Sequence, residues 1–255
     1  MKIAICAIIK DEQRYLEEWI NHHLKLGFDD IYLYEDFNST SHQDICSRYE
    51  HVFLNSINNF LKTNINDYKR QIKTYRYFIK LFKEKYDWVT FIDIDEYINT
   101  EDGINLKSIL TSFEQFDGLF IFWKMYNANN LIEPPCDFKI VNNYTTIFES
   151  NDPHLCLCKS FVNLKKDIEL KSHHAVERGV NTLKSNSRWD ISYDKIWINH
   201  YYTKSWSEWL VQIFKRGDLW RGHRRLFDFF TINPEMKNKL PELISNMGSL
   251  YRKYK

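Results

Sequence analysis

The chain has few of the residues that interrupt regular structure or cross-link it, with 7 Gly, 5 Pro and 5 Cys among 255 residues. So little glycine and proline excludes a collagen-like or disordered chain. The cysteines are odd in number and scattered, and they form no Cys-x-x-Cys pair. This pattern excludes a small disulfide scaffold and a usual zinc knuckle. We therefore expect reduced thiols and a cytoplasmic location.

Long apolar runs and an excess of one charge are also missing. The first apolar run, Ile3–Ile9, is too short for a signal-peptide core, and no segment reaches the roughly 18 apolar residues of a membrane-spanning helix. The 35 Lys and Arg residues balance 34 Asp and Glu residues. A nearly neutral chain lacks the broad basic face of a nucleic-acid-binding protein, so no nucleic-acid partner is expected.

Aromatic residues are abundant, with 8 Trp, 16 Tyr and 18 Phe making up 16% of the chain. This number exceeds what a core alone needs, and we expect some of the rings to line a cleft. A chain of this length allows one large domain or two small ones. The absence of a repeat or a clear linker favours a single domain over residues 1–255.

The N-terminal pattern predicts a βαβ unit. Ile3–Ile9 is a continuous apolar run, typical of a strand buried on both faces of a parallel sheet. Asp11 is expected to cap the following helix, Gly27 to end it, and Ile31–Tyr34 to form a second, parallel strand. Ligands in open α/β sheets bind at the carboxyl ends of such strands.

The same reasoning places further elements along the chain. Strands are expected at 51–54, 88–92 and 118–123, and helices at 67–86, 105–113 and 205–217. The last of these helices opens with Ser205 and Glu208, which have the spacing of a capping box. The fold class is therefore α/β: a Rossmann-like, mostly parallel sheet flanked by helices. We expect residues 1–123 to form a nucleotide-binding half, 124–217 a loop-rich half and 218–255 a helical tail.

An acidic cluster, Asp93-Ile-Asp95-Glu96, follows the strand at 88–92 without an intervening turn residue. In an extended backbone, residues two apart point to the same side, so Asp93 and Asp95 are expected to converge on one cation. Two carboxylates at the end of a strand suit Mg²⁺ or Mn²⁺, which keep positions for phosphate oxygens. The alternative is a solvated acidic turn.

Three segments in order resemble motifs of glycosyltransferase family 92 and its bacterial relatives. Phe91-Ile-Asp-Ile-Asp-Glu-Tyr-Ile98 resembles the family's F-[IL]-D-x-D-E-[FY]-[IL] segment. Residues 7–34 resemble its K-N-E…Y-L-x-E-W-I-x-x-H segment, and residues 199–217 resemble N-H-Y-x-T-K-S…K-x-x-R-G. The chain departs from the family at Asp11, where Asn is usual, and at Ser41, where an acid is usual. These departures concern the acceptor side more than the donor side.

The resemblance implies a GT-A fold and a metal-dependent, inverting transfer of sugar from a nucleotide-diphosphate sugar, with a UDP-sugar as first choice. It implies Mn²⁺ or Mg²⁺ as cofactor, and a glycan or lipid-linked saccharide of bacterial surface polysaccharide assembly as acceptor. The backbone of Ala7 and Ile8 would meet the base, and Glu12 and Asp36 would accept from base or ribose donors. Asp93 would approach the ribose or a metal-bound water, and Asp95 would bind the metal.

Metal and diphosphate ligands are implied in two separate parts of the chain, residues 93–95 and residues 200–216. Asp93, Asp95 and His200 are the implied metal ligands. Lys204, Lys215 and Arg216 are implied to hold the diphosphate. Alternatives stay open for some of them: His200 as a core histidine, and Lys215 and Arg216 as charges that complement a helix C-terminus.

The remaining expectations concern a second histidine and the catalytic base. His173, one of a histidine pair, is expected to face the donor, with a solvated pair as the alternative. Inverting transfer needs a general base. Glu133, Asp137, Glu149 and Asp152 are the candidates, and their spacing does not separate them. Glu149 and Asp152 lie in a polar loop before Lys159-Ser160, which resembles the family's K-S step, so Asp152 is favoured and Glu149 is the second candidate.

Two other functions fit parts of the sequence. A sugar nucleotidyltransferase would carry a glycine-rich loop after its first strand, but residues 9–14 contain no glycine. A carbohydrate-binding module would need neither the acidic cluster nor the βαβ start. Separately, residues 219–230 mix arginines with aromatic residues, as interfacial helices do. They predict peripheral contact with the inner face of a membrane, with core packing as the alternative.

Overall fold

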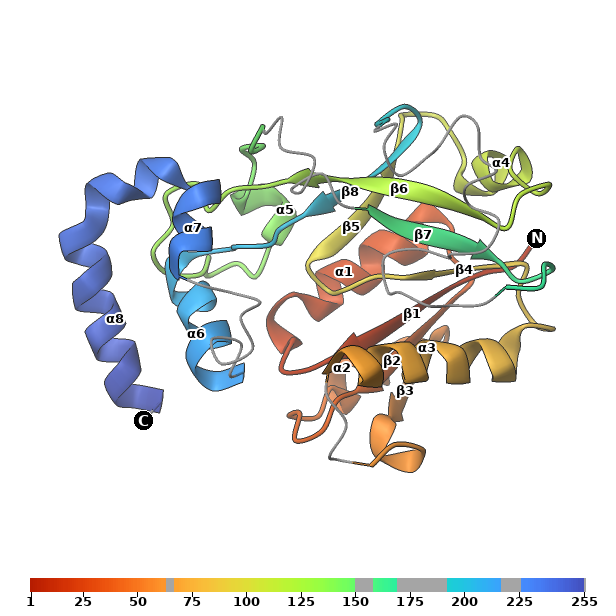
Figure 1. Ribbon diagram of the computed structural model, residues 1–255, viewed down its shortest axis with the longest axis horizontal. Coiled ribbons are helices and arrows are strands. Elements are labelled where there is room, and N and C mark those ends of the chain that lie inside the picture. The colour runs from red at the N-terminus through yellow and green to blue at the C-terminus, as the bar shows by residue number, and fades with distance from the viewer. Residues whose placement is uncertain (63–66, 150–157, 169–191, 217–225, 255) are drawn as a thin grey trace. The chain divides into compact units, whose positions relative to one another are not determined.

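The computed structural model describes residues 1–62, 67–149, 158–168, 192–216 and 226–254 (Figure 1). For Lys215 and Arg216, at the end of a helix, it describes the backbone alone. The chain forms two compact units. The first unit contains residues 1–123 and 150–199, and the second unit contains residues 124–149 and 200–255.

Four parallel strands form one half of an eight-stranded sheet, whose order is β3-β2-β1-β4-β7-β6-β8-β5 (Figure 1). Strand β1 pairs in parallel with β2 and β4, and β2 pairs in parallel with β3. These strands and the helices between them are β1 (Ile3–Ile9), α1 (Gln13–Leu26), β2 (Asp30–Glu35), α2 (Gln43–Cys46), β3 (Val52–Ser56), η1 (Ile57–Asn59), α3 (Asp67–Phe82) and β4 (Trp88–Phe91). The predicted βαβ unit is confirmed.

The other half of the sheet is mixed. Strand β7 (Cys158–Asn163) lies antiparallel between β4 and β6 (Gly118–Met125). Strands β8 (Ile196–His200) and β5 (Glu96–Thr100) complete this edge, and α4 (Leu106–Thr111) follows β5 with Asn105 as its N-cap. The fold is therefore α/β, with a mixed, largely parallel sheet flanked by helices. Strand β5 is an element that the sequence analysis does not predict.

Helix α1 ends as predicted but begins differently. Gly27 is its C-cap residue, with a φ of 110° that a residue with a Cβ rarely adopts. The N-cap residue is Glu12, which makes no side-chain cap hydrogen bond. The Asp11 Oδ1 atom instead accepts hydrogen bonds from the backbone N and Oγ1 of Thr40, both at 2.9 Å. The expectation that Asp11 caps the helix is therefore wrong, because its carboxylate joins the loops after β1 and β2.

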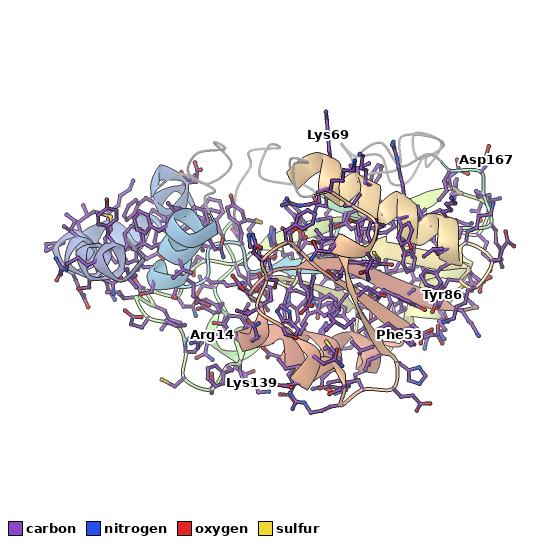
Figure 2. All side chains as sticks on the ribbon, turned by 90° about the horizontal axis from the view of Figure 1, so that it is seen from below. Arg14, Phe53, Lys69, Tyr86, Lys139 and Asp167 are labelled. Atoms are coloured by element: carbon purple, nitrogen blue, oxygen red, sulfur yellow. The ribbon has the colours of Figure 1, made fainter. Side chains whose placement is uncertain are left out.

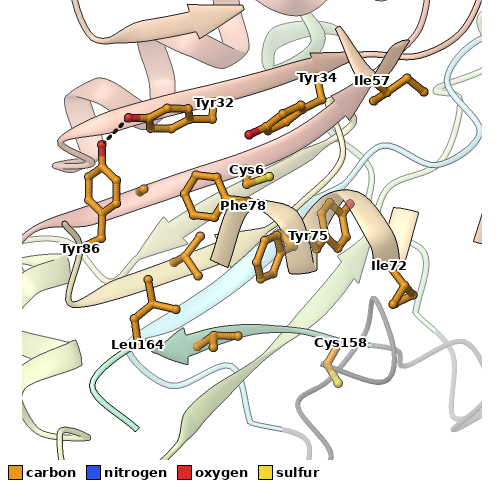
Figure 3. Close-up of a cluster of buried hydrophobic side chains, with 14 of the residues drawn as sticks. Cys6, Tyr32, Tyr34, Ile57, Ile72, Tyr75, Phe78, Tyr86, Cys158 and Leu164 are labelled. Carbon is orange, nitrogen blue, oxygen red and sulfur yellow. Dashed lines mark hydrogen bonds between the residues drawn. The ribbon is translucent and has the colours of Figure 1, made fainter. Parts of the chain in front are cut away.

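One cluster of buried side chains packs α3 against the sheet (Figure 3). Tyr75 and Phe78 of α3 lie against Cys6 of β1 and Tyr32 of β2, and all four are buried. The rings of Tyr75 and Phe91 stack at 4.4 Å between centroids. Much of the aromatic content is therefore used in this core, where each ring buries a large apolar area.

At the amino end of β2, a polar network surrounds Asp30. Tyr86 donates a hydrogen bond to the Asp30 carboxylate, and Tyr32 and Tyr86 are bonded through their hydroxyls at 2.9 Å (Figure 3). Lys85 Nζ lies 3.0 Å from Asp30 Oδ2, and 5.3 Å from the centre of the Phe53 ring. Phe53 and Tyr86 are labelled in Figure 2. The network lies at the opposite end of the parallel strands from their carboxyl ends.

The second unit is mainly helical in its C-terminal part. It contains α5 (Ile140–Asn143), α6 (Trp206–Arg216), α7 (Leu226–Ile232), η4 (Pro234–Lys239) and α8 (Leu240–Tyr254). Its core includes Trp206, Trp209 and Phe229. The helical C-terminal part agrees with the sequence analysis. Within the described ranges, no helix is long and apolar enough to cross a membrane.

The predicted capping box opens α6. The Ser205 backbone N donates to Glu208 Oε2 at 3.2 Å, and the Glu208 backbone N donates to Ser205 Oγ at 3.4 Å. The Tyr144 hydroxyl donates to the same Glu208 oxygen at 2.7 Å. Glu208 therefore caps the helix and also ties its first turn to the segment that contains α5.

Candidate functional site

The acidic residues after β4 form a turn, which we call the acidic turn (Asp93–Glu96). The Glu96 backbone N donates to the Asp93 carbonyl at 3.1 Å. In return, the Asp93 backbone N donates to Glu96 Oε2 at 2.9 Å. The extended backbone expected for Asp93 to Asp95 is therefore wrong: the chain reverses here because Glu96 begins strand β5 at the far edge of the sheet.

The acidic turn lies at the carboxyl end of β4, beside β1. The pairing of β1 with β4 ends at Cys6 and Phe91, whereas its pairing with β2 continues to Ile9 and Glu35. Strand β1 therefore extends past the last β4 residue with which it pairs. This is the edge of an open α/β sheet at which ligands bind. Ala7 and Ile8, the residues expected to meet the base, lie in this extension.

The side chain of Lys159, in β7, contacts two acids of the acidic turn. Its Nζ atom is 2.9 Å from Asp93 Oδ2 and 3.4 Å from Glu96 Oε2. Lys159 is 1% exposed and Glu96 is fully buried, while the Asp93 side chain is 39% exposed. An ammonium group buried this far from water needs such partners, since an unpaired buried charge costs several kcal/mol.

In this cluster, burial and the neighbouring charges shift the pKa values of the buried groups in opposite directions. Burial would lower the pKa of Lys159, but Asp93 and Glu96 outweigh it and hold that pKa above its usual value. Burial raises the pKa of Glu96, with the charge of Lys159 acting against the rise. Glu96 Oε1 is also buried, and it has no hydrogen-bond partner among the described residues. Lys159 is thus the cation that pairs with both Asp93 and Glu96 of the acidic turn.

The sequence analysis assigned no role to Lys159. The available signal was a single lysine near the start of the otherwise uncharged strand β7, Cys158-Lys-Ser-Phe-Val-Asn163. A lysine inside a strand that is buried on both faces needs a buried acid as partner. Which acid it meets depends on the pairing of β7 with β4 and β6, and this pairing is not local in the sequence.

Although the backbone is not extended here, Asp93 and Asp95 are the two carboxylates of the acidic turn that would bind a divalent cation. No group of three or more His, Cys, Asp or Glu side chains in the described part of the chain could hold a metal ion by itself. This donor set fits Mg²⁺ or Mn²⁺, which are commonly bound through one or two carboxylates together with substrate phosphates and water. Asp95 is 8% exposed and lies at the tip of the turn.

The loops that follow β1 and β2 are joined by a buried histidine. His42 Nε2 accepts from the Glu12 backbone N at 3.0 Å, while His42 Nδ1 donates to Glu35 Oε1 at 3.0 Å. The predicted nucleotide ligand Glu12 therefore lies in a loop of fixed conformation. This places it at the carboxyl ends of β1 and β2, as the sequence analysis expects.

Asp36, the other predicted base or ribose ligand, lies at the same edge. Its carboxylate pairs with Arg70 of α3, with Arg70 Nε 2.9 Å from Oδ1 and Nη2 2.9 Å from Oδ2. The Phe37 backbone N also donates to Asp36 Oδ1, at 2.8 Å. This two-pronged ion pair orients the carboxylate rigidly.

His22 and His23 pack α1 against β5. His23 is buried, its Nδ1 donates to the Trp19 carbonyl at 2.8 Å, and its Nε2 accepts from the Ile98 backbone N at 3.2 Å. Trp19 Nε1 donates to the Glu96 carbonyl at 2.8 Å. His23 and Trp19 are therefore packing residues, and Trp19 also holds the last residue of the acidic turn, Glu96, through its carbonyl.

Other predicted site residues belong to the second unit. His200 is buried at the end of β8, and its carbonyl accepts from the Tyr126 backbone N at 3.0 Å. Lys204 is buried just before α6, with a φ of 52°. Glu149 is exposed at the end of the 124–149 segment. Their roles stay predictions.

Four predicted residues cannot be placed by their side chains. Asp152 and His173 lie outside the described residues, and so do the side chains of Lys215 and Arg216 at the end of α6. Among the described residues of the first unit, the site consists of the acidic turn, Lys159 and the loops after β1 and β2.

Comparison with known proteins gives a distant relationship. No family model matches the chain. It is 26% identical over 111 residues to a glycosyltransferase family 92 protein of Ricinus communis, an alignment that covers 42% of this chain and 18% of the relative. A second family 92 protein, from Oryza sativa subsp. japonica, is 22% identical over 116 residues, covering 44% of this chain and again 18% of the relative. The chain is thus distantly homologous to glycosyltransferase family 92 and aligns with less than a fifth of these relatives' length.

Among solved structures, glucosyl-3-phosphoglycerate synthase from Mycobacterium tuberculosis, in complex with Mn²⁺, UDP and phosphoglyceric acid, is similar at a TM-score of 0.34. Its sequence identity is 13%, and the match covers 64% of this chain and 56% of that one. Because the TM-score is below 0.5, this likeness adds nothing to the fold described above.

Proposed function

We propose that the chain is a metal-dependent glycosyltransferase that moves a sugar from a nucleotide-diphosphate sugar to a glycan or lipid-linked acceptor. A UDP-sugar is the first choice of donor. The observation that carries the proposal is the acidic turn. It brings Asp93 and Asp95 to the carboxyl end of β4, beside the part of β1 that extends past its pairing with β4. Distant homology to glycosyltransferase family 92 supports the same activity.

The residues of the site suit the binding of a diphosphate donor. Asp93 and Asp95 would hold Mn²⁺ or Mg²⁺, which supplies a Lewis acid to neutralise the charge that builds up on the leaving diphosphate. Glu12 and Asp36, at the ends of β1 and β2, would accept hydrogen bonds from the base or the ribose. His200 is proposed as a third metal ligand. Lys204, Lys215 and Arg216 are proposed to hold the diphosphate, and His173 to face the donor. Asp152 or Glu149 is proposed to remove the proton from the acceptor hydroxyl.

The first prediction concerns donor binding. UDP should bind the chain at least about tenfold more tightly with Mn²⁺ than with EDTA, because the cation joins the diphosphate to the carboxylates of the acidic turn. Replacing Asp95 by Asn removes one of the two carboxylates and should abolish the Mn²⁺ effect. Isothermal titration calorimetry measures both affinities.

Asp102→Asn is the matched control, because Asp102 is an exposed aspartate outside the acidic turn. It should keep the Mn²⁺ effect. Equal UDP affinity with Mn²⁺ and with EDTA would argue against the transferase and in favour of a carbohydrate-binding or other role.

A further inference from the structure

Packing alone does not explain why a lysine, Lys159, is buried next to the acidic turn. Lys159 is 1% exposed in a strand whose neighbouring residues are also buried, a place where an apolar side chain would cost less. Its ammonium group contacts two acids of the same turn, Asp93 at 2.9 Å and Glu96 at 3.4 Å. The two acids differ sharply in exposure, because Glu96 is fully buried and the Asp93 side chain is 39% exposed.

These contacts connect the buried acid to the exposed one. Glu96 accepts from the Asp93 backbone N through Oε2, and Lys159 lies beside that same oxygen. Lys159 also holds Asp93 Oδ2. Glu96 therefore holds the backbone of Asp93, Lys159 holds its side chain, and Glu96 and Lys159 contact each other. Since Glu96 Oε1 lacks a hydrogen-bond partner among the described residues, this buried carboxyl group depends on two contacts at Oε2, from the Asp93 backbone N and from Lys159 Nζ.

We propose that Lys159 is a positioning residue that fixes the orientation of the Asp93 carboxylate for the cation–diphosphate site. This inference rests on the proposed function. In metal sites, a group that hydrogen-bonds to a metal ligand and orients it typically contributes a factor of about 10 to 100 in metal affinity. Lys159 has this relation to Asp93, and it keeps the acidic turn formed before any cation binds.

The test compares the full-length chain with Lys159→Met and with the double variant Lys159→Met/Glu96→Gln. The single variant leaves Glu96 buried without its cation, so its thermal unfolding midpoint should fall. The double variant replaces both members of the buried pair by uncharged side chains, so neither group is left without its partner and the midpoint should recover. Recovery would show that charge compensation is needed, since lost packing of the lysine stem is the same in both variants.

Two further readouts separate positioning from a structural role. In the double variant, hydrogen–deuterium exchange in peptides that span the acidic turn should be faster, and the affinity for Mn²⁺–UDP should be about tenfold or more weaker despite the recovered stability. Lys165→Met is the matched control. Lys165 follows β7 and pairs with Asp87 at 2.7 Å, away from the acidic turn. It should change neither the exchange nor the affinity.

Each outcome decides between the claims. If the unsubstituted chain shows no Mn²⁺-dependent binding of UDP, this result contradicts the proposed function and the positioning role with it. Binding by the unsubstituted chain together with unchanged exchange and affinity in the double variant would overturn the role of Lys159 alone. If Lys159→Met does not fold but the double variant does, the charge compensation is supported. If neither folds, the lysine stem is a packing element and the proposal fails.

Discussion

At the scale of single residues, the chain pairs charges in small groups that each contain a buried acid, Glu96 in one and Asp30 in the other. Lys159 joins Asp93 and Glu96 at the carboxyl ends of the parallel strands, and Lys85 joins Asp30 at their amino ends. The chain has 35 basic and 34 acidic residues, and in these two groups basic and acidic side chains lie in direct contact. A balanced total excludes a broad polyanion-binding face but is compatible with a compact site for one cation and one diphosphate.

Asp30 gives a prediction about the pH dependence of stability. Burial alone would raise the pKa of Asp30, but hydrogen bonds from Tyr86, Lys85 and His51 outweigh it and hold that pKa below its usual value. A carboxyl group whose pKa is lower in the folded chain stabilises the fold above its unfolded pKa of about 3.9, and this contribution is lost as the pH falls through the folded pKa. Asp30→Asn should therefore reduce the free energy of unfolding by about 2 kcal/mol at pH 7.

Urea denaturation between pH 3 and 7 tests this prediction. The difference between the unsubstituted chain and Asp30→Asn should narrow as the pH falls below about 4. Asp102→Asn, at an exposed aspartate, should show no comparable difference at any of these pH values. A constant difference between the chain and Asp30→Asn over the whole range would rule out the carboxylate as the source of the stability.

At the scale of elements, local signals were enough for some features and not for others. The βαβ start and the α6 capping box follow from periodicity and from residues three or four apart, so they could be predicted from the sequence. Strand β5 and the reversal at the acidic turn could not, because they depend on which distant strands pair. The role of Asp11 was predicted wrongly for the same reason: its partner, Thr40, is in another loop.

The capping box gives a prediction at this scale. Ser205→Ala removes the hydroxyl that accepts from the Glu208 backbone N, so it should lower the free energy of unfolding by about 1 kcal/mol. Ser249→Ala is the matched control: Ser249 is exposed inside α8, where alanine is a better helix former. It should leave the free energy unchanged or raise it slightly. Urea denaturation followed by circular dichroism measures both, and an equal effect of the two substitutions would contradict the cap.

At the scale of the whole molecule, the acidic turn belongs to one compact unit, and His200 and Lys204 belong to the other. The sequence placed Asp93, Asp95, Glu12 and Asp36 near the carboxyl edge of the sheet because strand order and direction determine that edge. It could not show how the metal, diphosphate and acceptor groups combine, since that depends on contacts between segments far apart in the chain. The proposed glycosyltransferase activity is therefore best tested on the complete chain.

The most direct measurement is the release of nucleoside diphosphate from a panel of nucleotide sugars by the full-length chain, with Mn²⁺ and with EDTA. We predict Mn²⁺-dependent cleavage of at least one donor, with UDP-sugars first. Asp95→Ala should lower the rate by about a hundredfold or more, because charge stabilisation by the metal supplies several kcal/mol. Asp102→Ala should keep the rate of the unsubstituted chain. Cleavage that persists in Asp95→Ala, or no cleavage of any donor with Mn²⁺, would contradict the assignment of the acidic turn to a nucleotide-sugar site.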